Sequence, residues 1–200
     1  MDIIGDFKAG MNAALHPSSN TQNMDLGQAI GFYYKASILP AILAIIIDGI
    51  IAYLVNPSLI ISTIGEIIGF LWILIPIGII ISAAVFQFFD KILLKIFKGD
   101  ISKTATAVMF EGMPLLVLAF LYFLPFNSPT SFMYYIKEIF ELIIGIWGII
   151  VLTVSFKEQQ NVSTGKAILA WLAPGIIIGV IVGIIAVALL ASIIAVAPAI

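Results

Sequence analysis

The sequence predicts an all-α membrane protein that crosses the bilayer several times. Of its 200 residues, 62% are hydrophobic and only 10% are charged, and the mean hydropathy is +1.20. These values lie outside the range of soluble domains. A hydrocarbon core of about 30 Å takes roughly 20 apolar residues of helix to cross. We therefore expect a bundle of five transmembrane helices, forming one domain over residues 36–200, with spans at about 36–55, 66–89, 105–124, 137–156 and 167–195.

Residues that break helices separate these spans. Asn56-Pro57 lies between the first and the second, and the prolines of PFNSP (125–129) end the third. The polar stretch FKEQQNVSTGK (156–166) separates the fourth from the fifth, with Ser163 and Thr164 as caps of the last helix. Four further prolines are expected to bend a span or to mark its first turn: Pro40, Pro76, Pro114 and Pro174.

The segment before the first span, residues 1–35, is predicted to lie at the membrane surface. Apolar residues from Ile3 to Leu15 recur at helical spacing, with polar residues opposite. This pattern fits an amphipathic helix in the interface, and it equally fits a helix packed on the ends of the bundle. Asp25 is expected to cap a second helix that leads into the first span. Acidic residues precede the first long apolar run, so we do not expect a cleaved signal.

The distribution of lysines predicts the orientation. All nine basic residues are lysines. Eight of them fall before the first span, between the second and third, or between the fourth and fifth, and only Lys137 falls on the other side. Cytoplasmic loops carry the excess of positive charge. We therefore expect a multi-pass protein of the cell membrane, with a cytoplasmic amino terminus and an external carboxyl terminus.

The stretch DKILLKIFKGD (90–100) is predicted to form a helix with a charged and an apolar face. At helical spacing, Lys91, Lys95 and Lys98 share one side. Such a helix suits contact with anionic headgroups, where each lysine contributes about 1 kcal/mol. A simple cytoplasmic extension of the second span explains the same residues, and both interpretations stay open.

Two carboxylates, Asp48 and Glu111, lie well inside predicted spans. A charge in hydrocarbon costs roughly 3 kcal/mol on insertion scales, so each needs a reason. Asp48 lies about 18 Å and Glu111 about 10 Å from the cytoplasmic ends of their helices. They either form a proton or cation relay, or are neutral groups that fix helix register through hydrogen bonds. Glu141 is expected to pair with Lys137 one turn away.

The last span carries glycines at intervals of four, Gly175, Gly179 and Gly183, in the stretch PGIIIGVIVG. A glycine face lets a neighbouring backbone come close in a membrane. The neighbour is either another helix of the same bundle or a second copy of the chain.

Several classes of function are not expected. The chain has no cysteine and a single histidine, His16, so it offers no thiolate or histidine cluster for a metal. The stretch QNVSTGKA lacks the first glycine and the final hydroxyl of a phosphate-binding loop. No zinc-binding helix or serine elbow is present. The net charge of -2 gives no reason to expect a nucleic-acid partner. Because the motifs above are missing, we also predict no enzyme, no catalytic residue and no cofactor.

Two stretches carry a resemblance to a known family, FKGDISKTATAVMFEGMPLLVLAF (97–120) and IWGIIVLTVSFKEQQNVSTGKAILAWLAP (146–174). They resemble the Yip (Ypt/Rab-interacting protein) membrane family, in a prokaryotic-type form with a short amino-terminal arm. Eukaryotic relatives carry a longer acidic, aromatic arm that is linked to Rab GTPases and vesicle traffic. That arm is missing from residues 1–35, so the resemblance implies the fold and a membrane-organising role more firmly than a GTPase partner.

Two functions are consistent with these features. The first is a non-enzymatic scaffold or adaptor that binds lipids and membrane proteins through residues 1–35 and 90–104. Its protein partner is either another membrane protein or a second copy of the chain, which would make it a homo-oligomer. The second is a small ion- or proton-coupled carrier or channel that uses Asp48 and Glu111. The sequence has no evident inverted repeat and few polar residues to line a path, which favours the scaffold.

Overall fold

The computed structural model describes residues 2–16, 24–117 and 132–196, and over these ranges every regular element is helical. Four helices are long and apolar enough to cross a membrane, at Leu26–Leu54, Pro57–Leu94, Tyr134–Gln160 and Thr164–Ala191. The chain therefore has the character of a multi-pass membrane protein. The rest of the third predicted span, from residue 118 onward, lies outside the described residues, so the five-helix bundle stays a prediction.

Helix α1 (Ile3–Leu15) is followed by α2 (Leu26–Val55), whose start is fixed by a capping box. The Asp25 carboxylate accepts a hydrogen bond from the Gln28 amide at 2.7 Å, and the Gln28 side chain accepts one from the Asp25 amide at 3.0 Å. The two bonds satisfy amides that have no partner within the helix. The predicted cap at Asp25 is confirmed, and the helix that it begins runs without interruption into the first span.

The second long helix consists of four consecutive pieces, α3 (Ile60–Gly69), η3 (Phe70–Leu74), α4 (Ile75–Phe89) and η4 (Asp90–Leu94). A short 3-10 turn, η2 (Pro57–Leu59), precedes them. In η3 the Ile75 amide bonds to the Phe70 carbonyl, one residue farther back than in an α-helix. Because Pro76 has no amide hydrogen, the Trp72 carbonyl also loses its α-helical partner.

Two tyrosines of α2 satisfy the carbonyls that η3 leaves free. The Tyr33 hydroxyl donates to the Leu71 carbonyl at 3.0 Å, and the Tyr34 hydroxyl donates to the Trp72 carbonyl at 2.8 Å. In hydrocarbon such carbonyls have no water to bond, so the two contacts offset the cost of the irregular turn. They also fix the register between α2 and the second long helix.

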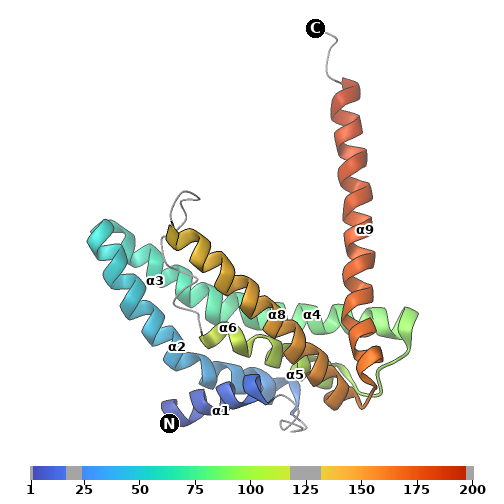
Figure 1. The fold of residues 1–200 in the computed structure, drawn as a ribbon, viewed down its shortest axis with the longest axis horizontal. Helices are drawn as coiled ribbons and strands as arrows, with labels where there is room; N and C mark the ends of the chain where they lie inside the picture. Colours follow the sequence, from blue (N-terminus) through green and yellow to red (C-terminus); the bar gives the residue numbers. More distant parts are fainter. Residues whose placement is uncertain (1, 17–23, 118–131, 197–200) are drawn as a thin grey trace.

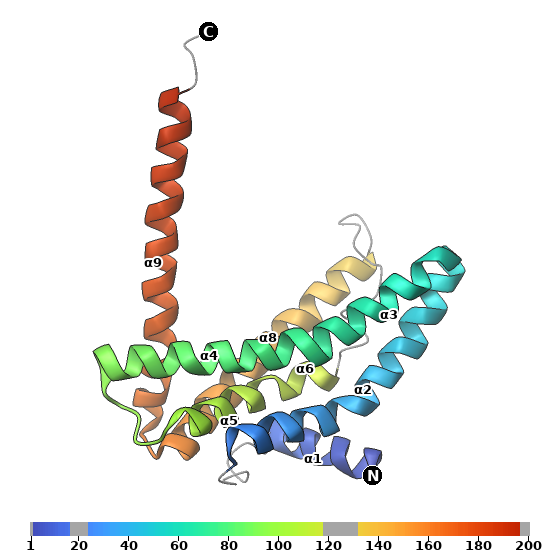
Figure 2. The ribbon, with the colours of Figure 1, turned by 180° about the vertical axis from the view of Figure 1, so that it is seen from behind.

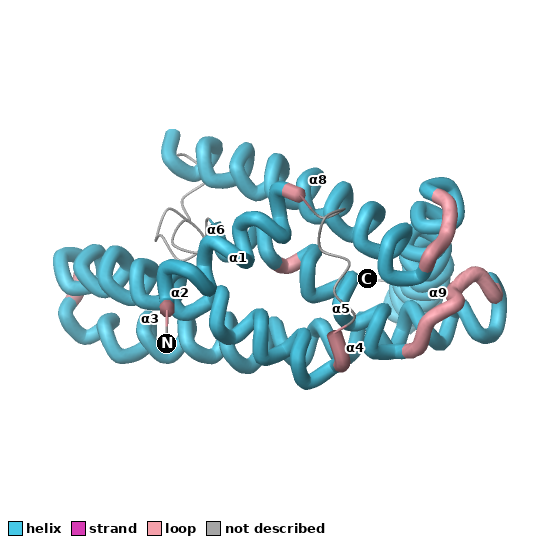
Figure 3. Tube along the Cα trace, turned by 90° about the horizontal axis from the view of Figure 1, so that it is seen from below, coloured by secondary structure: helices cyan, strands magenta, loops and turns pink. Residues whose placement is uncertain are grey.

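The centre of the bundle is a short helix, α5 (Ile101–Glu111), followed by α6 (Met113–Val117). Every residue from Thr104 to Phe110 is buried. Helix α5 packs against α2, α4 and α8 (Phe132–Gln160), and Figure 3 shows α5 and α6 between α8 on one side and α2 with α4 on the other. The break at Gly112 comes just before Pro114, which marks the first turn of α6 as predicted.

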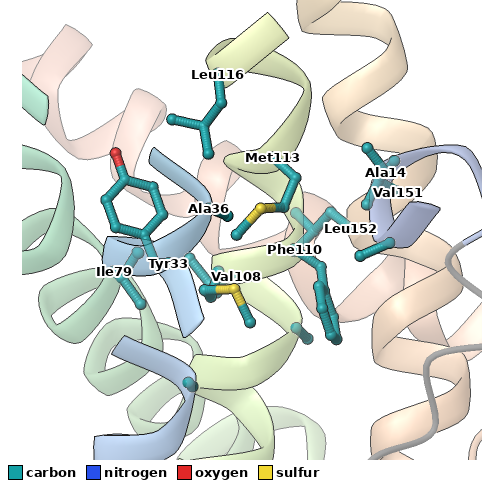
Figure 4. Close-up of a cluster of buried hydrophobic side chains, with 14 of the residues drawn as sticks. Ala14, Tyr33, Ala36, Ile79, Val108, Phe110, Met113, Leu116, Val151 and Leu152 are labelled. Carbon is teal, nitrogen blue, oxygen red and sulfur yellow. The ribbon is translucent and has the colours of Figure 1, made fainter. Parts of the chain in front are cut away.

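Side chains from α1, α2, α4, α5, α6 and α8 meet in the core shown in Figure 4. Helix α1 joins it through small residues. A Cβ atom on Gly10 would lie 2.8 Å from the Ala36 Cβ, and the Trp147 indole of α8 donates to the Ala14 carbonyl at 3.1 Å. Helix α1 thus packs on the bundle, while Ile4 and Leu15 stay exposed.

The last helix, α9 (Thr164–Val196), leaves the bundle. Figures 1 and 2 show it rising away from the other helices, which it touches only near its start, where it packs against α8 and α4. Each long helix has a most apolar stretch, and the buried share of that stretch is 33% in Leu26–Leu54, 28% in Pro57–Leu94 and 33% in Tyr134–Gln160. In α9 the buried share is only 6%. Nearly all of its apolar surface is free to meet lipid or protein.

The stretch from Asp90 to Asp100 does not form the predicted amphipathic helix. The helical path ends at Leu94, and Lys95 takes a left-handed conformation with φ 52°. The buried Asp90 carboxylate accepts hydrogen bonds from the Ile96 and Phe97 amides at 2.7 and 3.0 Å, which turns the chain back. The prediction that Lys91, Lys95 and Lys98 share one helical face is wrong for this reason, and the extension of the second span is what the structure contains.

Candidate functional site

The clearest candidate site is a pocket of about 340 Å³ at the point where α5 ends. One wall comes from η3 and α4, a second from the end of α5, and a third from α8. Its lining residues are Phe70, Leu74, Ile75, Gly78, Ile79, Val108, Glu111, Gly112, Ile144, Gly145 and Gly148. The wall residues of α4 and α8 lie near the middle of the Pro57–Leu94 and Tyr134–Gln160 spans. The pocket is therefore at mid-depth of two predicted spans.

Glu111 is the one charged residue in this lining. Its side chain is half-buried, and no hydrogen bond or ion pair holds its carboxylate within the described ranges. Helix α8 passes close to it: a Cβ atom on Gly148 would lie in van der Waals contact with Glu111, 3.5 Å from its carbonyl oxygen and 3.7 Å from its Cγ. The site thus combines one unpaired carboxylate with apolar walls.

The second predicted intramembrane carboxylate, Asp48, is not part of this pocket. It is 1% exposed, and both of its carboxylate oxygens are buried without a hydrogen-bond partner in the described structure. Tyr33 marks the level of the pocket on α2, because its hydroxyl bonds the Leu71 carbonyl next to the pocket wall. Asp48 lies 15 residues farther along α2, which is about 22 Å of helix at 1.5 Å per residue. Asp48 is not among the described residues that line this pocket, and no contact joins it to Glu111 in the described structure.

At the end of the bundle that carries the predicted lysine-rich loops, a polar network joins three elements. Gln160, at the end of α8, accepts a hydrogen bond from the Gly99 amide at 2.7 Å and donates to the Thr104 hydroxyl at 3.0 Å. That hydroxyl lies 2.7 Å from Gln87 Oε1 on α4. This network was not predicted from the sequence, although Gln87 and Gln160 beside apolar runs are a visible signal of buried polar contacts.

The three lysines predicted to contact lipid headgroups are exposed at this same end. Lys91 borders a groove of about 670 Å³, together with Gln87, Asp100 and apolar residues of α4 and α5. Lys95 and Lys98 lie in the loop that the network holds. At the opposite end, Lys137 pairs with Glu141 at 3.6 Å, as predicted.

The glycine face of α9 has no neighbour in the described structure. A Cβ atom on Gly175, Gly179 or Gly183 would meet no heavy atom within 4 Å. The face is therefore open, and no helix of the described bundle packs against it.

No group of three His, Cys, Asp or Glu side chains in the described ranges is placed to hold a metal ion. Comparison with known proteins adds no identity: no family model matches the chain, and no curated protein or solved structure matches it.

Proposed function

We propose that the protein is a non-enzymatic membrane scaffold, a five-helix bundle of the Yip type that binds lipids and other membrane proteins, a second copy of itself included. The observation that carries the proposal is the position of α9. Only 6% of its most apolar stretch is buried, and its glycine face is uncovered. A transmembrane helix associates through such faces because close backbone packing, rather than the hydrophobic effect, drives contact within lipid.

The cytoplasmic side of this scaffold is the end that carries the Gln160 network. In this proposal α1 lies at the interface, with the exposed Ile4 and Leu15 turned toward lipid, and the amino terminus is on the cytoplasmic side of the cell membrane. Lys91, Lys95 and Lys98 contact anionic headgroups from the turn after the second span. Helix α9 starts at this end and crosses to the outside, in agreement with the distribution of lysines.

Disulfide crosslinking in membranes tests the α9 contact. The natural chain has no cysteine, so a single introduced cysteine reports on one position. Gly179→Cys places the thiol on the glycine face, and Ile181→Cys places a matched thiol about 160° around the helix. We expect an oxidised dimer from Gly179→Cys alone. A product of another mass would make a different membrane protein the occupant, and equal crosslinking at both positions, or none, would refute the contact.

A small carrier is the second candidate, and Asp48 is the observation that favours it. A buried carboxylate without a partner inside a membrane helix is by default a sign of function. The test is proton and cation flux in proteoliposomes, comparing the natural chain with the Asp48→Asn, Glu111→Gln double variant. Flux that the variant loses would establish transport. If neither the natural chain nor the variant, both shown to be folded, carries any flux, the scaffold is the remaining proposal.

A further inference from the structure

The pocket around Glu111 has features of a ligand site that the scaffold function does not use. Its volume of about 340 Å³ is near the lower end of the range of roughly 300 to 1,000 Å³ for small-molecule sites. That space holds a small amphiphile and excludes a whole phospholipid. Leu74 and Gly145 in its lining are exposed, and each lies near the middle of a helix long and apolar enough to cross a membrane, so the pocket opens at a depth that a ligand dissolved in the bilayer can reach.

The walls of the pocket define the body of the ligand. Apart from Glu111, the lining residues that the structure describes are aliphatic, phenylalanine and glycine residues. The four glycines, Gly78, Gly112, Gly145 and Gly148, keep the space free of side chains. An apolar body fits these walls, while a sugar or a phosphate would find no donors among them.

Two features define the polar end of the ligand. The Glu111 carboxylate has no partner in the described structure, and an opposite charge nearby favours the ionised form of a carboxylate. Glu111 is also the last residue of α5, so the negative end of that helix dipole lies at the pocket. Both features attract a cation, and a primary ammonium satisfies the carboxylate with short, charge-assisted hydrogen bonds.

We propose that this pocket binds a lipid-soluble primary amine, with its apolar body between α4 and α8 and its ammonium group on the Glu111 carboxylate. The inference is independent of α9, because no α9 residue lines the pocket. If the crosslinking test fails, the amine-site proposal therefore still stands. If amine binding is not found, the scaffold proposal still stands.

The test is saturable binding of radiolabelled decylamine to the full chain in nanodiscs, with empty nanodiscs as background and decanol and decanoate as probes of equal length. We expect one saturable decylamine site and weaker binding of both other probes. Glu111→Gln keeps the shape but removes the charge, and should lower decylamine affinity about tenfold or more, because hydrogen bonds to charged groups exceed neutral ones. Asp48→Asn, which removes the second carboxylate predicted to lie well inside a span, should bind normally.

A second variant separates recognition from folding. Gly145 lines the pocket and a Cβ atom on it would meet nothing within 4 Å, so Gly145→Leu adds side-chain volume at the pocket wall without striking the backbone and leaves Glu111 in place. It should abolish binding, whereas Gly65→Leu, at an equally open position of α3 away from the pocket, should not. Decanol binding as tightly as decylamine, or Gly145→Leu binding normally, would overturn the proposal.

Discussion

The Gly99 amide donates a hydrogen bond of 2.7 Å to the Gln160 side chain, joining two turns that are 61 residues apart in the chain. The two turns lie in residues 97–120 and 146–174, the two stretches on which the proposed Yip-type fold rests. A Cβ atom on Gly99 would lie 2.7 Å from Gln160 Oε1, so any larger residue here would force the Gln160 side chain to shift. Gln160 is fully buried, so the contact is a structural link between the second, third and fourth predicted spans rather than a surface bond.

We expect Gln160→Leu to destabilise the fold by about 1–3 kcal/mol, because it removes two hydrogen bonds and leaves the part-buried Gly99 amide without this partner. The Gly99 amide should then exchange with solvent deuterium faster than in the natural chain. Glu158→Gln, at a partly exposed position of the same turn, is the control and should change stability by less than about 0.5 kcal/mol. Unchanged Gly99 exchange in folded Gln160→Leu protein would show that the link is not structural.

A second prediction concerns the irregular turn η3. Tyr33→Phe should cost about 1–3 kcal/mol, because the Leu71 carbonyl loses its donor in a buried setting. Tyr53→Phe, whose ring is 58% exposed, is the matched control and should be neutral.

The relation between Tyr34 and Pro76 can be measured by a double-mutant cycle on thermal unfolding in detergent. Pro76→Ala restores an amide that can bond the Trp72 carbonyl, so Tyr34→Phe should cost less in that background than in the natural one. Strictly additive effects would show that Tyr34 does not replace the amide donor that Pro76 denies to the Trp72 carbonyl.

A third prediction tests the docking of α1. Gly10→Val should push α1 off the bundle, because its Cβ would overlap the Ala36 side chain. In a chain with a single cysteine at the buried position 13, maleimide labelling should accelerate at least about tenfold, which corresponds to a loss of about 1.4 kcal/mol in docking. Ala9→Val, on the exposed side of the same helix, should leave labelling slow. Equal rates in all three chains would mean that α1 is not held by this contact.

A fourth prediction concerns the lysines after the second span. Replacing Lys91, Lys95 and Lys98 by Gln should reduce retention of phosphatidylglycerol relative to phosphatidylcholine, by about fivefold for each lysine near a charged surface. Native mass spectrometry of the purified protein measures the retained lipid. Lys137→Gln, at the opposite end of the bundle, should have no effect. If it has the same effect as the triple variant, the lysine turn has no special role.

The features predicted correctly from the sequence are those that depend on local chemistry. The Asp25 cap, the first turn at Pro114 and the Lys137–Glu141 pair each involve residues within four positions of one another. Residue type and spacing are enough for such contacts. The long apolar helices were predicted for the same reason, because their signal is composition over about 20 residues.

The features that were missed depend on contacts between distant residues. Residue type and spacing gave no sign that the Tyr33 hydroxyl bonds the Leu71 carbonyl, which the wide turn η3 leaves free 38 residues farther along the chain. Lys95 and Lys98 had helical spacing, yet the Asp90 carboxylate binds amides beyond the helix end and stops it. Glu111 was singled out by its charge, but its pocket is formed by three helices that no local pattern places together.

The central claim is that α9 leaves its own bundle and keeps its glycine face open for a partner. Nitroxide labels at successive cysteines from 176 to 190, in nanodiscs that hold one copy of the chain, measure this through their accessibility to oxygen. The account predicts uniformly high accessibility around the helix in single copies, and a minimum every 3.6 residues centred on Gly179 and Gly183 when copies are crowded into one membrane. A helical minimum on the glycine face that persists in single copies would show that α9 packs against its own bundle, and would contradict the claim.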